Sequence, residues 1–229
     1  ISTDDAWPVS STQVTQPAIN AWKFFDDEVD LQPVRVPDEG LLHFGVRVFD
    51  NEDGTWRYEY AIHNLNSDRS VNSFTVPLGD CVSVSDIGFN DIDYHSGEVI
   101  DSTDWSVSTT GSEITWSTDT YDTNEWANAI RWGSTYSFWF TADHGPEDSP
   151  LDLGLFKPGN APSITHLAAA PHCPSNCIGD VDGSGSVNVA DLLALVSVWG
   201  SSDPSGDVNN DGIVNVNDIL AVMSDWGCS

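Results

Sequence analysis

The chain has 229 residues, and its 36 acidic residues against seven Lys or Arg give a formal net charge of −29 at pH 7. This charge argues against nucleic acids and anionic membrane surfaces as partners, because both repel a polyanion. With 39% apolar residues and ten tryptophans the chain can bury a core, so global disorder is not expected. No apolar run approaches the ~18 residues of a membrane helix, and we expect no membrane insertion.

Residues 1–20 are polar and contain Pro8 and Pro17, which predicts an extended N-terminal segment. The chain opens on Ile1 rather than Met, as expected for a secreted protein whose signal peptide has been removed. The cysteine count of four, an even number, agrees with an oxidising compartment. We therefore expect an extracellular, secreted protein.

From Leu41 onward apolar and polar residues alternate, a pattern typical of half-buried strands. The clearest pair is a hairpin joined by the turn DNEDGT, with Leu42, Phe44, Val46 and Val48 on one strand and Trp56, Tyr58, Tyr60 and Ile62 on the next. Further strands are expected at Phe74/Val76/Leu78, Val82/Val84, Trp105/Val107, Ile114/Trp116, Ile130/Trp132 and Tyr136/Phe138/Phe140.

These short strands, and the lack of a helical pattern before residue 185, predict a mainly β protein with an antiparallel β-sandwich over residues 21–170. The segment 161–174 is expected to join the sandwich to a smaller domain over residues 171–229. It lacks a long Pro/Thr or Gly/Ser tract, so it is not expected to act as a flexible tether.

The smaller domain contains a duplication. The stretch 179–200, GDVDGSGSVNVADLLALVSVWG, returns at 206–227 as GDVNNDGIVNVNDILAVMSDWG, without a gap and with 13 identical positions. Each copy begins with a polar loop and continues with apolar residues at helical spacing. Trp199 and Trp226 close the two expected helices, and each is followed by Gly in the usual C-terminal stop position.

Both polar loops have the spacing of an EF-hand calcium loop, in which positions 1, 3, 5, 7, 9 and 12 supply oxygen ligands. Position 7 needs only its backbone carbonyl, and Gly at position 6 permits the central turn. The first loop places Asp180, Asp182, Ser184, Ser186, Asn188 and Asp191 at the ligand positions. The second loop places Asp207, Asn209, Asp211, Ile213, Asn215 and Asp218 there. Three carboxylates converge in each loop, so ordering each loop should require a cation, and we expect two Ca²⁺ ions.

Two such loops, each followed by one helix and with no helix before the first, resemble a dockerin domain. The resemblance covers about residues 178–228, and it implies a small α-helical, EF-hand-like fold around two calcium ions. Many dockerins attach extracellular enzymes or binding modules to cohesin domains through a Ser-Thr pair at loop positions 10 and 11. Here those positions hold Val189-Ala190 and Val216-Asn217, so a cohesin of the well-known kind is not supported.

The cysteines allow two pairings. Cys177 and Cys228 bracket the duplication, and a disulfide between them would close a loop of about 52 residues and contribute roughly 4 kcal/mol. Cys81 would then pair with Cys173 and attach the connecting segment to the sandwich. The competing arrangement pairs Cys173 locally with Cys177. Metal binding by cysteine is not expected, because no histidine or second cysteine pair stands at ligand spacing.

No catalytic motif is present, so we expect a protein that is not an enzyme. Glu59, Glu98, Glu113 and Glu125 are conceivable glycosidase carboxylates, but none stands in a motif, and a glycoside hydrolase is the runner-up among enzymatic functions.

Two non-enzymatic functions are compatible with the sequence. The first is a calcium-binding structural protein, a subunit of an extracellular filament or surface layer that associates with itself or with another extracellular protein. In this case Thr12, Val14 and Gln16 alternate like a strand that could join a neighbouring sheet. The alternative is a carbohydrate-binding sandwich module in a polysaccharide-degrading system, carried by a dockerin. In that case sugars would stack on exposed tryptophans, although the core also needs aromatic residues. The tryptophans of the sandwich are Trp22, Trp56, Trp105, Trp116, Trp126, Trp132 and Trp139.

Overall fold

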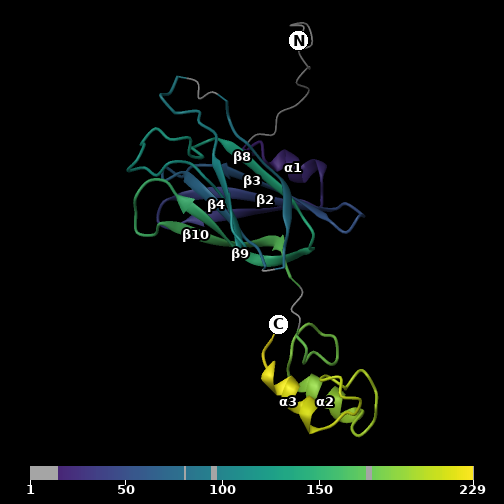
Figure 1. Ribbon diagram of the computed structural model, residues 1–229. Coiled ribbons are helices and arrows are strands. Elements are labelled where there is room, and N and C mark those ends of the chain that lie inside the picture. Colours follow the sequence, from purple (N-terminus) through teal and green to yellow (C-terminus); the bar gives the residue numbers. More distant parts are fainter. Residues whose placement is uncertain (1–14, 80, 94–96, 174–176, 229) are drawn as a thin grey trace. The chain divides into compact units, whose positions relative to one another are not determined.

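The computed structural model describes residues 15–79, 81–93, 97–173 and 177–228 (Figure 1). The chain divides into two compact units, which we call the first unit (residues 1–172) and the second unit (residues 173–229). Each has its own hydrophobic core. Most of the predicted extended segment, including Thr12 and Val14, lies outside the described residues, and helix α1 (Asn20–Phe25) begins at its last residue. No helix in the described part is both long and apolar enough to cross a bilayer.

The first unit consists of two five-stranded sheets whose strand pairs are all antiparallel within the described ranges. Sheet A has the order β1 (Asp30–Val36), β2 (Gly40–Asp50), β3 (Trp56–Asn64), β8 (Thr135–Ala142) and β5 (Val84–Asn90). Sheet B has the order β10 (Ser163–Pro171), β9 (Pro146–Leu155), β4 (Val71–Pro77), β7 (Glu113–Ser117) and β6 (Ser106–Thr109). The prediction of a mainly β, antiparallel protein is confirmed.

The predicted hairpin is strands β2 and β3, which pair from Leu42–Asn64 to Asp50–Trp56 across the expected turn. Alternation explains this pairing, because successive side chains of a strand point to opposite faces. The buried face carries the predicted residues, with Leu42, Phe44 and Val46 on β2 and Tyr58, Tyr60 and Ile62 on β3.

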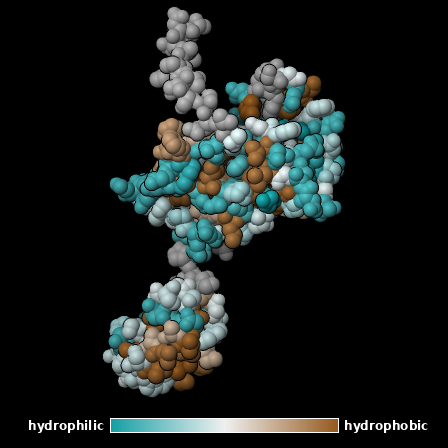
Figure 2. Space-filling view, turned by 180° about the vertical axis from the view of Figure 1, so that it is seen from behind, coloured by the Kyte–Doolittle hydropathy of each residue, from teal (hydrophilic) through white to brown (hydrophobic). Residues whose placement is uncertain are grey.

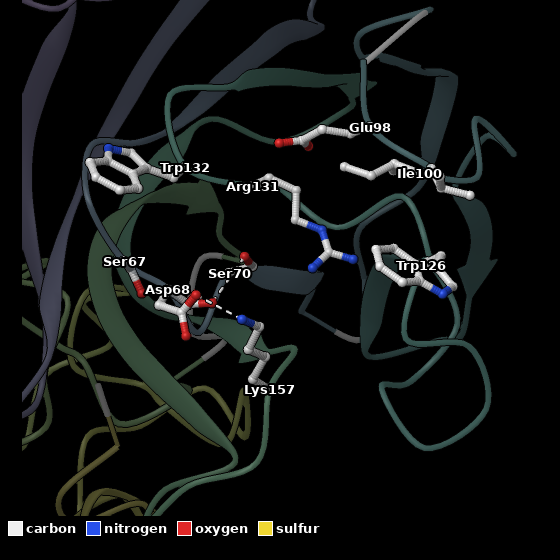
Figure 3. A pocket seen from close by; sticks show the side chains of 10 residues that line it. Ser67, Asp68, Ser70, Glu98, Ile100, Trp126, Arg131, Trp132 and Lys157 are labelled. Atoms are coloured by element: carbon white, nitrogen blue, oxygen red, sulfur yellow. Dashed lines mark hydrogen bonds and ion pairs between the residues drawn. The ribbon is translucent and has the colours of Figure 1, made fainter. Parts of the chain in front are cut away.

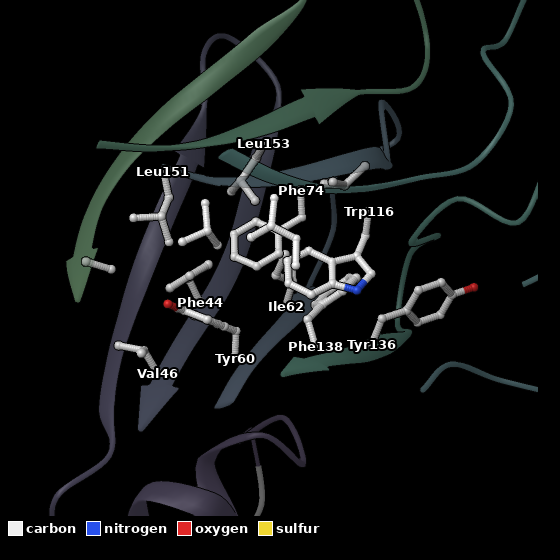
Figure 4. Close-up of a cluster of buried hydrophobic side chains, with 14 of the residues drawn as sticks. Phe44, Val46, Tyr60, Ile62, Phe74, Trp116, Tyr136, Phe138, Leu151 and Leu153 are labelled. Carbon is white, nitrogen blue, oxygen red and sulfur yellow. The ribbon is translucent and has the colours of Figure 1, made fainter. Parts of the chain in front are cut away.

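The two sheets meet across a core of aromatic side chains (Figure 4). Phe74 of sheet B lies 5.1 Å, centroid to centroid, from Phe138 of sheet A, and Trp116 packs edge-on against the same ring at 5.5 Å. The phenol of Tyr60 donates a hydrogen bond to the carbonyl of Ala169 at 2.9 Å. Tyrosine can therefore be buried here because its polar end finds a partner on the facing sheet.

Two predictions about the sandwich are wrong. The segment 161–174 was expected to be a connector but contains β10, whose inward series Ile164, His166, Ala168 and Ala170 packs against the core, so this strand belongs to the sandwich, in keeping with the predicted bounds 21–170. Its alternation is weak in the sequence because small alanines replace large apolar residues. The strand expected at Ile130 and Trp132 is also absent, because only one isolated bridge forms there, between Ile130 and Val71.

The second unit contains two nine-residue helices, α2 (Val189–Ser197) and α3 (Val216–Ser224). Each helix ends two residues before the tryptophan that was expected to close it. Gly200 and Gly227 have positive φ angles of 75° and 81°, as a residue that reverses the chain after a helix requires. The small core lies between the helices and the loops and is formed by Val187, Leu195, Val214 and Val222 with Cys177.

Candidate metal centre

The two polar loops each bring three carboxylates together. One triad is Asp180, Asp182 and Asp191, and the other is Asp207, Asp211 and Asp218. Within each triad one carboxylate oxygen of every residue lies within 4.8 Å of the other two. Either triad could therefore hold a metal ion.

The first aspartate of each loop organises the turn that follows it. The carboxylate of Asp180 accepts hydrogen bonds from the backbone N–H of Ser184 at 3.0 Å and of Gly185 at 2.8 Å. Gly185 has a φ of +84°, a left-handed conformation that is strained for a residue with a Cβ atom. Asp207 makes the same two bonds, at 3.0 and 2.8 Å, to the residues four and five positions later. The loops have one geometry, built twice.

The last aspartate of each loop is shared between the candidate metal site and the start of the helix. Asp191 accepts the backbone N–H of Asn188 at 2.8 Å, while the Asn188 side chain accepts the N–H of Ala190 at 2.9 Å. This reciprocal arrangement is a capping box, and Asn215 with Asp218 forms the second one. Position 9 of each loop is therefore also the N-cap of its helix.

Hydrogen bonds favour the charged form of two of the triad carboxylates, those of Asp191 and Asp211. Burial acts to raise the pKa of Asp191, but the backbone N–H groups of Asn188 and Asp182 outweigh it and leave the pKa below its usual value. The pKa of Asp211 is lowered by the backbone N–H of Ile213 and further by neighbouring amide side chains. Oxygen donors with several negative charges suit a hard cation such as Ca²⁺.

The remaining predicted ligand positions also lie in the loops. The position 7 carbonyls, of Ser186 and Ile213, accept the side-chain amides of Asn188 and Asn215 at 3.2 and 2.9 Å. Ser184, at position 5 of the first loop, donates a hydrogen bond to the Ser186 carbonyl at 3.2 Å. Asn209, at position 3 of the second loop, donates one to the Asp211 carboxylate at 3.1 Å. The other predicted ligand positions therefore lie in the same loops as the two triads, where their side chains make hydrogen bonds within the loop.

Each loop is fastened to the other repeat, a relationship that the sequence did not indicate. Val187 and Val214, at position 8 of the two loops, each exchange two backbone hydrogen bonds with the segment after the other repeat's helix. The partner segment is 227–228 for Val187 and 200–201 for Val214, with N···O distances of 2.8 to 3.0 Å. The end of α3 therefore supports the first loop, and the end of α2 supports the second.

A disulfide joins Cys177 to Cys228, with a Cα–Cα distance of 5.7 Å. The alternative pair of Cys173 with Cys177 does not form. Cys81 and Cys173 are disulfide-bonded as well, and none of the cysteines is free in the described part of the chain.

The two helices of the second unit expose apolar side chains at equivalent positions, 27 residues apart in the sequence. We call these the helix faces, and they consist of Val189, Leu193, Val196 and Trp199 on one repeat and Val216, Leu220, Met223 and Trp226 on the other. Figure 2 shows apolar residues gathered on the visible side of this unit. Monomeric soluble proteins rarely expose large contiguous apolar patches, so the helix faces are a candidate interaction surface.

The structure also locates the candidate glycosidase carboxylates and the tryptophans. Glu59 points out of sheet A and pairs with Arg57 at 3.4 Å. Glu113 and Glu125 are exposed, and Glu98 lines a surface pocket. Of the tryptophans, Trp105 and Trp116 are buried, Trp22, Trp56 and Trp139 are half-buried, and Trp126 and Trp132 are exposed in the same pocket as Glu98.

No family model and no curated protein matches the chain. Among solved structures, the fimbrial adhesin FimA of Actinomyces is similar at 16% sequence identity and a TM-score of 0.27. The similarity covers 64% of this chain and 49% of the adhesin chain, so this chain spans about half the length of that protein. A TM-score of 0.27 does not establish a shared fold.

Proposed function

We propose that this chain is a secreted, non-enzymatic structural protein whose second unit is a dockerin-like domain that binds two calcium ions. The observation that carries this proposal is the duplication of one loop geometry. Asp191 and Asp218, like Asp180 and Asp207, accept the same backbone hydrogen bonds at matching distances in the two loops. If the two Asp-rich turns served only to begin the helices, there would be no reason for both to bring three carboxylates together in the same way.

Calcium is the cation that the two loops suit best. Ca²⁺ accepts six to eight oxygen ligands in flexible geometry, whereas Mg²⁺ requires a compact octahedron and keeps several waters. Each loop offers three carboxylates, a backbone carbonyl and further side-chain oxygens. Two bound Ca²⁺ ions, each adding two positive charges, would change the formal net charge from −29 to −25. The ions therefore also reduce the repulsion that opposes assembly.

The helix faces are the surface by which the protein would assemble, and we propose a second copy of the same chain as the occupant. Isologous pairing requires a surface that is complementary to itself, which a duplicated apolar face provides. Calcium would organise this surface, because the aspartate that closes each loop lies in the first turn of the helix that follows. The disulfide bonds support a location outside the cell, since such bonds persist in oxidising compartments.

Sedimentation velocity of the full chain tests the proposal, and calorimetric titration counts the ions. We expect two Ca²⁺ ions per chain and larger species in calcium than in chelator. Leu193→Asp and Leu220→Asp should each reduce association. Leu167→Asp is the matched control, because Leu167 on β10 is 66% exposed, as is Leu193.

Three results would count against this function. A chain that stays monomeric in calcium points to a different extracellular protein as the partner of the helix faces. A titration without bound calcium removes the dockerin-like assignment. Polysaccharide hydrolysis that one carboxylate substitution abolishes contradicts the non-enzymatic role.

A further inference from the structure

A pocket of about 430 Å³ lies in the first unit, well away in sequence from the calcium loops (Figure 3). Its walls come from the connections between β3 and β4, between β5 and β6 and between β7 and β8, together with Lys157 just after β9. Connecting segments held on a rigid sandwich are a common place for binding sites. The volume falls within the ~300–1,000 Å³ typical of small-molecule sites.

Two exposed tryptophans are the main feature of this pocket. Trp126 is 50% exposed and Trp132 is 74% exposed, and in Figure 3 they lie on opposite sides of the Arg131 side chain. Neither indole belongs to the core of the sandwich. Burial of apolar surface stabilises a protein by about 25 cal/mol for each Å² removed from water, and the exposed part of these rings does not contribute this free energy. A ligand that covers the rings would recover this free energy.

The backbone that carries the tryptophans is anchored by buried residues and hydrogen bonds. Of the five residues between them, the first four, 127–130, are buried. Arg131 donates two hydrogen bonds through Nη2, to the carbonyls of Glu125 and Ala127, each at 3.0 Å. The carbonyl of Trp126 accepts the N–H of Asp101 at 2.8 Å, which ties two of the pocket's connections together. Such a preorganised site loses little conformational entropy when a ligand binds.

Polar groups that can hydrogen-bond a ligand line the same pocket. The guanidinium of Arg131, a residue that lines the pocket, packs 4.5 Å above the Phe156 ring. Lys157 pairs with Asp68 at 2.7 Å, and Glu98 adds a second carboxylate. Two cations and two carboxylates make the pocket formally neutral in a chain of net charge −29.

We propose that this pocket binds a neutral saccharide. A pyranose ring has a flat C–H face and a rim of hydroxyls, so it can stack on Trp126 and Trp132 while its hydroxyls bond to Arg131 and Glu98. Hydrogen bonds to charged groups are stronger than those between neutral groups, which favours ligands with many hydroxyls. The negative field of the whole chain disfavours uronic acids and other anionic ligands. This inference does not depend on calcium binding by the second unit.

Affinity electrophoresis of the full chain in calcium tests the inference. The gels contain xylan, mannan, mixed-linkage β-glucan or galactan as neutral probes, and alginate or polygalacturonate as acidic probes. We expect at least one neutral polysaccharide to retard the protein, and Trp126→Ala and Trp132→Ala each to weaken retardation at least about tenfold. Phe25→Ala is the control, because Phe25 is an aromatic residue of α1 that is 84% exposed and belongs to neither the pocket nor the helix faces.

A second pair of variants separates loss of the ring from loss of folding. Trp132→Phe keeps a flat aromatic face and should retain most of the binding, whereas Trp132→Leu keeps apolar bulk without the face and should lose it. The inference is overturned if no neutral probe retards the chain, or if only acidic probes do. Equal loss in Phe25→Ala, or wild-type binding by both alanine variants of the pocket, also overturns it.

Discussion

Asp191 and Asp218 are equivalent residues of the two loops, and each accepts two backbone hydrogen bonds, at 3.1 and 2.8 Å. Both carboxylates are fully buried, and both cap the helix that follows. One side chain thus serves the candidate metal site and the start of the helix. Changes at these positions should therefore affect metal binding and local folding together.

Replacing either carboxylate with the amide should weaken the site in its own loop more than the site in the other loop. In Asp191→Asn or Asp218→Asn the loop loses one of three negative charges but keeps a side-chain oxygen. Calorimetric titration should show one Ca²⁺ site of the two weakened at least about tenfold. Asp203→Asn is the control, because Asp203 lies between the loops and belongs to neither triad. Two unaltered sites in the triad variants would remove these residues from the ligand set.

The two sites should bind calcium cooperatively. Val187 in the first loop is hydrogen-bonded to the segment after α3, and Val214 in the second loop to the segment after α2. In Asp207→Asn, which changes the second loop only, we expect the affinity of the first site to fall as well, by roughly fivefold. Titration of this variant against the wild type measures the effect. A first site of unchanged affinity would show that the cross-repeat bonds carry no coupling.

Removing calcium should unfold the second unit and leave the first intact. Each triad contains three carboxylates within 4.8 Å, and without a cation their repulsion opposes folding. The first unit has a separate core and no part in either triad. Scanning calorimetry should show two transitions in calcium, of which chelator lowers only one. If both transitions move equally, the units do not unfold independently.

The Cys177–Cys228 disulfide should account for much of the stability of the second unit. It closes a loop with a sequence separation of 51, for which the chain-entropy estimate is roughly 4 kcal/mol. The double variant Cys177→Ser with Cys228→Ser should lower the free energy of unfolding of this unit by about that amount in denaturant titrations with calcium. As a control, the variant and the wild type are both measured under reducing conditions. The disulfide is then absent from both, and their free energies of unfolding should agree.

Mild acid should destabilise the first unit through its histidines. Burial lowers the pKa of His43, His63 and His166, and His43 lowers that of His63 further. His43 and His63 face each other on β2 and β3, with ring centroids 6.1 Å apart. The folded state thus binds fewer protons than the unfolded state, whose histidines titrate near pH ~6.5. Their contribution to stability is complete above that pH and decreases as the pH falls below it.

Urea unfolding of the first unit at about pH 7.5 and pH 5.5 measures this effect, because carboxylates with ordinary pKa values titrate near pH ~4 and change little in that window. Asp91, whose pKa burial raises, is the exception among the described carboxylates of this unit. His63→Gln should reduce the difference between the two pH values, since it removes one titrating group and its repulsion with His43. An equal difference in the variant and the wild type would assign the pH dependence to other groups.

The sequence alone determined the features that depend on short stretches of chain. Each candidate metal loop lies within twelve residues, so the spacing of its aspartates and Gly185 or Gly212 suffices to place the ligands together. Strands β2, β3 and β8 could be predicted in the same way, because alternating large apolar residues have one face to bury.

Only the tertiary structure decided which residues share a surface. Trp116 and Trp132 have the same local pattern, since each follows an isoleucine by two positions. Trp116 is nevertheless buried in the core, whereas the chain turns at Gly133 and Trp132 is exposed to solvent. The pocket around Arg131 collects residues from segments far apart in the sequence, and the strand order joins β3 to β8. Burial and proximity depend on contacts between distant segments, and no local pattern specifies which segments will meet.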